Sequence, residues 1–250
     1  MRTTAGRFPS LSVFFPAYND APALPALVAR TFAVLEEHVD DFEVIVVNDG
    51  SRDATSIVLD ELEARYGARL RVVTHARNRG YGAALRSGFA AATKDLVFYT
   101  DGDGQYDVGQ LPELLAQLGP YTGFVNGYKL ERRDPLHRIW IGKAYNRFAA
   151  FLFGVQIRDI DCDYRLIRRQ LLDQILLEST SGTVCVELVR KLEMTGWEFA
   201  EVGVHHYSRQ YGRSQFFRVR SLVNTLGQLL RLYANLVVLP ALARKAQRTA

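Results

Sequence analysis

The sequence predicts an α/β protein with a mostly parallel central sheet flanked by helices. Along the first half of the chain, short apolar runs alternate with segments whose apolar residues recur at helical spacing, a pattern typical of a parallel sheet with crossover helices. The 250 residues are 48% hydrophobic and 23% charged, which is the composition of a globular protein. Polar clusters at residues 16–20, 48–53 and 100–107 each follow a predicted strand. Because ligands bind at the carboxyl ends of such strands, we expect the three clusters to share one crevice.

The predicted elements of the first half follow one another in a regular order. Residues 11–15 are expected to form the first strand, and apolar residues at helical spacing between 24 and 35 indicate the helix after it. The apolar, largely β-branched run at 42–47 favours a strand that is buried on both faces. Ser51 or Asp53 is expected to cap the next helix, which ends near residue 66. The remaining predictions for this half are a strand at 70–74, a helix at 80–92, a strand at 96–100, a helix at 108–118 and a strand at 123–128.

The second half is less regular. Helices are expected at 169–177 and 184–194, and alternating apolar residues predict a strand at 199–207. The aromatic and basic stretch 139–153 is interpreted as core rather than as a lipid groove. Together with the first half, these segments form one predicted catalytic domain, residues 8–215, which a C-terminal amphipathic helix and tail, 216–250, follow.

The C-terminal arm is basic. From residue 202 onward there are eight Lys or Arg and no Asp or Glu, while the residues before it carry 23 basic and 27 acidic side chains. Such an arm indicates an anionic partner, a membrane surface or a phosphorylated substrate, and no nucleic-acid-binding module accompanies it. Apolar residues of 219–239 fall at helical spacing, but without 18 uncharged apolar residues in a row a membrane span is not expected. Two alternatives stay open, a helix packed on the body or at a homo-oligomer interface, and a helix lying in the membrane surface.

The cysteine content favours a reducing compartment. Cys162 and Cys185 give neither a disulfide framework nor a zinc-binding spacing. A cytoplasmic protein is therefore expected, held peripherally on the inner face of the membrane if the basic arm binds lipid.

Two carboxylates one residue apart end the predicted strand 96–100. Alternate side chains of an extended segment point to the same side, so Asp101 and Asp103 are expected to face together. Carboxylate and amide oxygens suit a hard divalent cation that completes its shell with substrate phosphates. Asp-Gly is also a strong hairpin-turn signal, so the turn taken alone fits either interpretation. Its place at the carboxyl end of a strand, beside two other polar clusters, favours the metal site.

Four motifs, in order and at the expected spacing, resemble glycosyltransferase family 2. They are Pro16-Ala17-Tyr18-Asn19-Asp20, residues 47–53 (VNDGSRD), residues 78–88 (NRGYGAALRSG) and Asp101-Gly102-Asp103-Gly104-Gln105. Within that family the chain most resembles the dolichol- or polyprenyl-phosphate sugar synthases, on the acidic turn and on residues 145–147, 152–154, 161–166 and 209–214. The resemblance covers about residues 10–215.

The resemblance implies a GT-A fold that binds a nucleotide-diphospho-sugar, a UDP- or GDP-sugar, with Mg²⁺ or Mn²⁺. It implies base and ribose contacts for Pro16, Tyr18 and Asp49. Asp101 would face the ribose or the metal, while Asp103 and Gln105 would hold the metal against the diphosphate. Further candidate donor-binding residues are Asn19, Asp20, Gly50, Ser51, Asn78, Gly80, Gly102, Lys129, Arg132, Arg209 and Ser214.

Transfer of the sugar leaves charge on the departing diphosphate, which a bound metal neutralises. Arg209 and Arg213 lie on a polar link that is expected to close over the phosphates. A phosphate monoester acceptor is already ionised near neutral pH and needs positioning more than deprotonation. A hydroxyl acceptor needs a base instead, and Asp161 or Asp163 is the candidate. The alternative for these two acids is that they cap a helix or pair with Arg165 and Arg168. Asp163 replaces the glycine or alanine that is commoner in the family, which leaves the acceptor open.

The leading prediction is an inverting, metal-dependent glycosyltransferase that moves a sugar from the nucleotide to a polyprenyl phosphate at the cytoplasmic membrane face. One alternative keeps the donor chemistry with a soluble sugar, small-molecule or protein hydroxyl as acceptor. Another, from a different class, is a nucleotide-sugar-binding or scaffold protein without turnover. The intact acidic turn and Gln105 argue against this last alternative.

Overall fold

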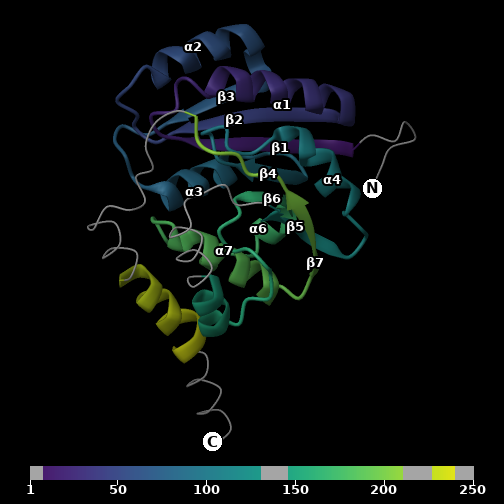
Figure 1. The fold of residues 1–250 in the computed structure, drawn as a ribbon, viewed down its shortest axis with the longest axis vertical. Helices are drawn as coiled ribbons and strands as arrows, with labels where there is room; N and C mark the ends of the chain where they lie inside the picture. The colour runs from purple at the N-terminus through teal and green to yellow at the C-terminus, as the bar shows by residue number, and fades with distance from the viewer. Residues whose placement is uncertain (1–7, 131–145, 211–226, 240–250) are drawn as a thin grey trace, which may run out of the picture.

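The computed structural model describes residues 8–130, 146–210 and 227–239. Within them, seven strands form one sheet in the order β3-β2-β1-β4-β6-β5-β7 (Figure 1). The strands are β1 (Phe8–Ala17), β2 (Val39–Asn48), β3 (Leu70–Thr74), β4 (Leu96–Thr100), β5 (Thr122–Lys129), β6 (Tyr164–Arg168) and β7 (Glu198–Val204). The predicted α/β class and mostly parallel sheet are confirmed, and β1 and β2 begin several residues earlier than their apolar runs.

β6 is the antiparallel member of the described sheet. It pairs with β4 on one side and with β5 on the other, both antiparallel, while the remaining pairings are parallel. The sequence analysis did not predict this strand and expected a helix at 169–177, where the structure has only the short α6 (Arg169–Leu172). Arg165 and Arg168 interrupt the apolar pattern of this strand, yet Arg165 is fully buried. Two of its partners, Tyr99 and Asn126, lie far from it in the chain.

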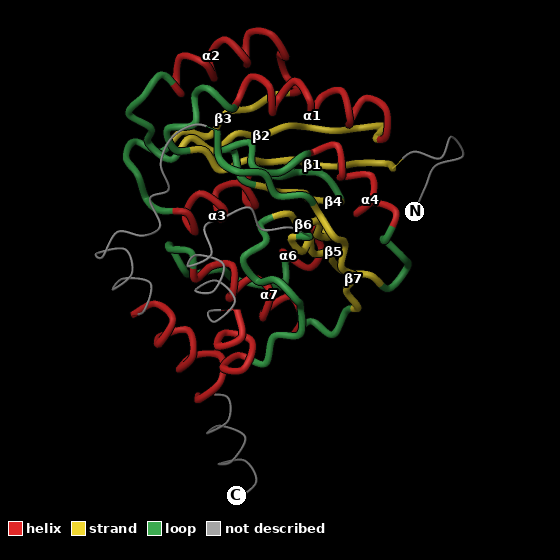
Figure 2. The backbone as a smooth tube through the Cα atoms, viewed as in Figure 1, coloured by secondary structure: helices red, strands yellow, loops and turns green. Residues whose placement is uncertain are grey.

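Helices cover both faces of the sheet and bury two separate cores. One core packs α1 (Leu24–His38), α2 (Thr55–Tyr66) and α4 (Leu111–Ala116) against one face. The other packs α3 (Tyr81–Ala91) and α7 (Thr183–Met194) against the opposite face (Figure 2). Successive residues of β4 alternate between them, since Phe98 belongs to the first core and Tyr99 to the second. The predicted helix 108–118 is a 3₁₀ turn, Val108–Gln110, followed by α4.

The C-terminal helix packs on the body. Residues 227–239 are helical, with a π-helical turn at Ala234–Val238. Leu229 and Leu232 are buried in the second core, and the ring of Tyr233 lies 6.0 Å from that of Phe153. Of the two alternatives, the described part of this helix therefore shows packing on the body, while residues 216–226 and 240–250 lie outside the described part. No helix in the described ranges is long and apolar enough to span a membrane.

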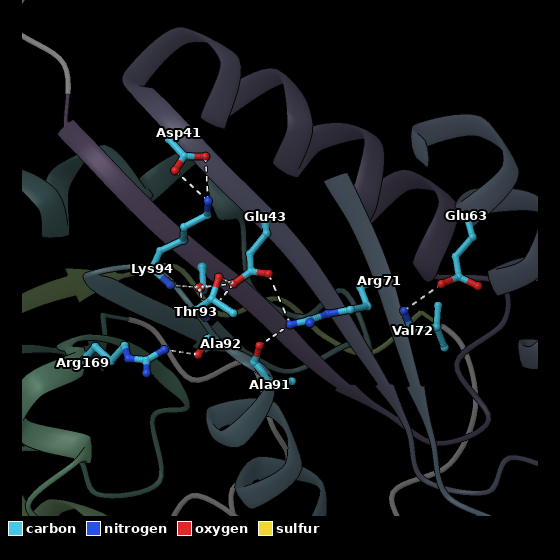
Figure 3. Close-up of polar contacts among 11 residues, drawn as sticks. Asp41, Glu43, Glu63, Arg71, Val72, Ala91, Ala92, Thr93, Lys94 and Arg169 are labelled. Carbon is cyan, nitrogen blue, oxygen red and sulfur yellow. Dashed lines mark hydrogen bonds and ion pairs between the residues drawn. The ribbon is translucent and has the colours of Figure 1, made fainter. Parts of the chain in front are cut away.

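Polar contacts fasten the amino-terminal edge of the sheet (Figure 3). The carboxylate of Glu43 accepts hydrogen bonds from Ser12 Oγ at 2.7 Å and from Thr93 N at 2.7 Å, and it pairs with Arg71 at 3.3 Å. Burial alone would raise the pKa of Glu43, but these donors hold it below its usual range. Lys94 pairs with Asp41 beside it. These contacts join β1, β2 and the segment before β4, and leave the opposite, carboxyl edge for the predicted site.

Candidate active site

Backbone hydrogen bonds draw the three predicted polar clusters together at the carboxyl edge of the sheet. Gly102 N donates to Pro16 O at 3.1 Å, and Asp49 N donates to Ala17 O at 2.9 Å. A Cβ on Gly102 would lie 2.7 Å from Pro16 O, so only glycine allows the acidic turn to approach the end of β1 this closely. The three clusters therefore lie together at one edge of the sheet, as predicted, while a ligand crevice shared by all three stays a prediction.

The first two clusters interlock through side chains. Asn19, whose φ is 59°, donates its N–H to Ser51 Oγ at 3.0 Å and accepts from Arg52 N at 2.7 Å. Asp20 Oδ2 accepts from Tyr18 N at 2.9 Å. An open pocket of about 380 Å³ lies beside them, lined by Asn19, Pro22, Arg52 and Asp53. Asp53 rather than Ser51 lies at the start of α2, where it accepts from Thr55 N at 3.0 Å.

Asp49 fastens the loop that carries Asn78 and Gly80. Its Oδ1 accepts from Arg79 N at 2.9 Å and contacts His75 Nδ1 at 2.6 Å, and its Oδ2 accepts from Gly80 N at 2.9 Å. Both carboxylate oxygens are thus engaged by the protein, so base or ribose contact by Asp49 stays a prediction. Gly50 lets this loop pack closely against the end of β2, because a Cβ at Gly50 would lie 2.4 Å from the Arg77 carbonyl carbon.

The acidic turn presents two differently supported carboxylates. Asp103 is buried, and its Oδ1 accepts from Gln105 N at 3.0 Å. Asp101 Oδ1 accepts from Tyr81 Oη at 2.8 Å. Asp101 directly follows Thr100, which pairs with Tyr164 in the antiparallel β4–β6 ladder, so Asp163 lies opposite Asp101. Burial, with the charges of Asp163 and Asp103, raises the pKa of Asp101 well above its usual range.

Gln105 ties the turn to the chain after β7. Its Nε2 donates to Tyr207 O at 2.9 Å, and Tyr207 N donates to its backbone oxygen at 2.8 Å. The side-chain oxygen has no hydrogen-bond partner among the described residues, so it is available as the predicted metal ligand. This contact also brings the 208–210 segment over the turn.

Arg209 neutralises the acidic turn. Its Nη2 donates to Asp103 Oδ2, and its Nη1 lies 3.9 Å from Asp20 Oδ1. The sequence analysis placed Arg209 on the diphosphate, whereas here it binds the carboxylate that is predicted to hold the metal. Burial, with the nearby charge of Asp103, raises the pKa of Asp20 to about 6, although the Tyr18 N–H and Arg209 oppose this shift. Arg209 thus offsets part of the clustered negative charge of Asp20 and Asp103.

Arg165 forms a buried network behind the turn, and within it the structure shows the Asp163–Arg165 pairing that the sequence analysis left open. It is 0% exposed and donates to Asn126 Oδ1 at 2.6 Å, to Asp163 Oδ1 at 2.7 Å, to Tyr99 Oη and to Ile160 O. Burial would lower the pKa of Arg165, but Tyr99 and Asp163 raise it above its usual range. Cys185 Sγ completes the network at 3.3 Å from Asp163 Oδ1, and burial raises the pKa of this thiol.

Asp161 lies on a loop held by Asn146. Asn146 Nδ2 contacts Asp159 Oδ1 at 3.1 Å and Asp161 Oδ2 at 3.3 Å, and Lys129 Nζ donates to Asp161 O at 2.9 Å. Asn146 lies in the predicted core stretch, of which Ala149 and Phe153 are buried but Phe148 and Phe151 are exposed. The predicted site residues Arg132, Arg213 and Ser214 lie outside the described residues.

The oxygen atoms at the acidic turn have the chemistry of ligands for a divalent metal whose shell substrate phosphates complete. Asp101, Asp103 and Gln105 offer the oxygen ligands that Mg²⁺ and Mn²⁺ prefer. Within 8–130, 146–210 and 227–239, no group of three or more His, Cys, Asp or Glu could hold a metal ion. Mg²⁺ is commonly bound by one or two carboxylates together with substrate phosphates, so two carboxylates and one amide suffice.

Comparison with known sequences places the chain in a family. The profile described as Glycosyl transferase family 2 matches residues 12–176. The undecaprenyl-phosphate 4-deoxy-4-formamido-L-arabinose transferase of Pseudomonas fluorescens strain SBW25 is 30% identical over 224 residues, which cover 88% of this chain and 63% of that protein. The protein of the same name from Pseudomonas aeruginosa strain LESB58 is 31% identical over 216 residues, covering 85% and 62%. The chain thus spans less than two thirds of these relatives' length.

Solved structures share the fold. Glucosyl-3-phosphoglycerate synthase from Mycobacterium tuberculosis, in complex with Mn²⁺, uridine diphosphate and glucosyl-3-phosphoglycerate, superposes with a TM-score of 0.65 at 21% identity, covering 92% of this chain and 80% of that one. A mannosyltransferase from Pyrobaculum calidifontis in complex with GDP-Man and Mn²⁺ gives a TM-score of 0.62 at 20% identity, covering 88% and 64%. The GT-A fold predicted from the motifs is confirmed.

Proposed function

Because the chain belongs to glycosyltransferase family 2, we propose that it is an inverting, metal-dependent transferase that moves a sugar from a UDP- or GDP-sugar to a polyprenyl phosphate. The arrangement of the acidic turn carries this proposal. Asp101 and Asp103 lie at the end of β4, in the middle of the sheet, between the β1–β2 loops on one side and the Asp159–Asp163 loop on the other. The nucleoside would lie over β1 and β2, the diphosphate over β4, and the sugar and acceptor over β6 and β5.

The chain's own residues have separate tasks in this reaction. Asp101, Asp103 and Gln105 would hold Mg²⁺ or Mn²⁺, which when bound neutralises the charge that develops on the departing diphosphate. Arg209 would leave Asp103 and turn to the phosphates as the metal arrives. The interlocked Asn19–Ser51 pair and the Asp49-held loop with Asn78 would fix the nucleoside. Holding the donor in one orientation lets the acceptor oxygen attack from the face opposite the leaving group, which inverts the anomeric centre.

The acceptor is proposed from two observations. The two relatives described above carry undecaprenyl-phosphate in their names. A phosphate acceptor is already ionised near neutral pH, so the protein needs no general base to activate it. Lys129, held at the Asp161 backbone, and Arg132 are candidate cations for its phosphate. A soluble hydroxyl acceptor is the second candidate, favoured by the acidic Asp161 and Asp163. Asp163 accepts from Arg165 and lies opposite Asp101, near enough to the turn for a base role.

The membrane-facing surface is proposed to be the helix pair 146–153 and 227–239, which touch through Phe153 and Tyr233. Phe148 is 54% exposed, Phe151 88% and Leu230 61%. Such an apolar surface on a chain with a basic arm suits the interface of an anionic bilayer. The protein would then act peripherally on the cytoplasmic face.

A donor–acceptor assay tests the transferase proposal. The protein is incubated with a panel of UDP- and GDP-sugars and undecaprenyl phosphate, with and without Mn²⁺. We expect a lipid-linked sugar with one donor only when metal is present, and loss of product in Asp103→Ala. Asp41→Ala, at the opposite edge of the sheet, should retain activity. Product from a soluble acceptor alone would move the proposal to the second candidate, and nucleotide-sugar binding without any turnover would favour the non-catalytic binding protein.

Liposome flotation tests the membrane proposal separately. Phe151→Asp should reduce co-flotation with anionic vesicles, while Tyr121→Asp, which changes an aromatic residue that is 71% exposed elsewhere, should not. Equal flotation of the two variants would contradict the assignment of this surface.

A further inference from the structure

Tyr81, at the start of α3, and Asp101, in the acidic turn, contact each other in the site. Tyr81 is the first residue of α3, and its Oη donates to Asp101 Oδ1 at 2.8 Å. Among the described residues it is the hydrogen-bond partner of the Asp101 side chain. The two neighbouring carboxylates accept hydrogen bonds from cations instead, Asp163 from Arg165 and Asp103 from Arg209. Asp101 thus depends on a neutral phenol where its neighbours have cations.

The phenol is held in place by its own backbone. On one side of Tyr81, the carboxylate of Asp49 accepts from Arg79 N and Gly80 N, both at 2.9 Å. On the other side, Gly82 N donates to Thr180 O at 3.0 Å. A Cβ on Gly82 would lie 2.4 Å from Ser179 O, so the start of α3 packs closely against the loop of residues 178–181.

The 178–181 loop is itself fixed from two elements. Glu187 of α7 is 0% exposed and accepts from Glu178 N at 2.9 Å and Ser179 N at 2.8 Å. Gln228 of the C-terminal helix accepts from Thr180 N at 3.0 Å and donates to Thr180 Oγ1 at 3.1 Å. The backbone that carries Tyr81 is therefore held by Asp49 after β2, by α7 and by the C-terminal helix, independently of the acidic turn.

We infer that Tyr81 is a positioning residue for the acidic turn. Its phenol fixes one oxygen of Asp101, which leaves Oδ2 for the metal or the ribose and keeps the carboxylate from turning away from the charges of Asp103 and Asp163. This inference rests on the proposed function, because it gives Asp101 a ligand to hold. Tyr81 touches Asp101 and acts through it.

The test measures metal binding rather than turnover. Mn²⁺ binding to wild type, Tyr81→Phe and Asp101→Asn is followed by electron paramagnetic resonance of free Mn²⁺, alone and in the presence of UDP or of GDP. The Tyr81–Asp101 contact is a hydrogen bond to a charged group, and loss of such a bond weakens binding about tenfold. We therefore expect the Tyr81→Phe variant to bind the metal–nucleotide pair about tenfold more weakly than wild type. In the Asp101→Asn background the same change should add nothing, because the two residues act as a unit.

A matched control separates positioning from stability. Tyr164 is a buried tyrosine whose Oη donates to Asp107 O at 3.0 Å and not to Asp101. Tyr164→Phe should lower the melting temperature without changing Mn²⁺ affinity. Unchanged affinity in Tyr81→Phe, or an additive loss in the double variant, would overturn the role of Tyr81. Wild-type protein that binds neither Mn²⁺ nor nucleotide would overturn the proposed function and this inference with it, and is thereby distinguished from failure of Tyr81 alone.

Discussion

Replacing Arg209 with glutamine should change metal affinity in opposite directions with and without nucleotide. In the structure the guanidinium donates to Asp103 and lies near Asp20, so it occupies the position where a metal would bind Asp103. A metal arriving alone must displace it. A metal arriving with a diphosphate gives Arg209 a new partner in the phosphates.

The expected magnitude follows from the contacts. One unit charge about 4 Å from another interacts by about 4 kcal/mol at an effective dielectric constant near 20. The Arg209 side chain is 29% exposed, so hydration recovers much of this, and a charge-assisted hydrogen bond retains roughly 2 kcal/mol net. Without nucleotide, Arg209→Gln should therefore bind Mn²⁺ about 10- to 30-fold more tightly than wild type. With UDP or GDP it should bind the pair several-fold more weakly.

Titration of free Mn²⁺ by electron paramagnetic resonance measures both values in one protein preparation. Arg158→Gln serves as the control, since Arg158 pairs with Glu201 and its own side chain is 68% exposed. Its Mn²⁺ affinity should match wild type. An Arg209→Gln variant that binds Mn²⁺ no more tightly than wild type in the absence of nucleotide would refute the idea that Arg209 holds the place of the metal.

Three further outcomes follow from the same structure. Arg165→Met should lower the free energy of unfolding in urea by about 3–5 kcal/mol, because it leaves the Asp163 charge buried and unpaired; adding Asp163→Leu should recover part of this, and a fully additive double variant would argue against the pair. The pKa of Asp20 is raised from 3.8 to about 6, so between these values the folded state binds a proton that the unfolded state has lost. The free energy of unfolding of the metal-free protein should therefore fall by up to about 3 kcal/mol as the pH rises from about 4 to about 6. Asp20→Asn should flatten this pH dependence in thermal melts, and an unchanged slope would contradict the shift. Gly67→Ala should destabilise by the backbone strain of its positive φ alone, about 1–3 kcal/mol, because a Cβ there meets no described atom within 4 Å. Gly50→Ala should destabilise more than Gly67→Ala in the same urea titration, because its Cβ would also meet the Arg77 carbonyl carbon at 2.4 Å, and equal losses would contradict this.

The first half of the fold and the centre of the site could be predicted from the sequence because local patterns encode them. β3, β4, α2 and α3 begin and end within a residue or two of their predicted bounds. The acidic turn, the Asn19–Ser51 region and Asn78 fall at the ends of parallel strands, and parallel topology alone brings those ends to one edge. The family profile agrees with the motifs that carried the resemblance.

The second half could not be predicted in the same way because its decisive contacts join residues far apart in the chain. β6 contains a fully buried arginine, which interrupts the apolar pattern of the strand and is explained only by the distant partners Tyr99 and Asn126. The C-terminal helix had two alternatives until Leu229 and Leu232 were found in the second core. Burial of a charge or an apolar stripe depends on the partner surface, and a sequence pattern does not specify that partner.

The sequence by itself determined the fold class, the family and the carboxylates of the acidic turn, since strand alternation and motif spacing are properties of short segments. Only the tertiary structure decided what those carboxylates touch. It placed Arg209 on Asp103, Tyr81 on Asp101 and Asp163 opposite them, through segments 20 to 106 residues away. Side-chain partners at such separations depend on how the sheet and loops pack, and that packing sets the charge and orientation of the site.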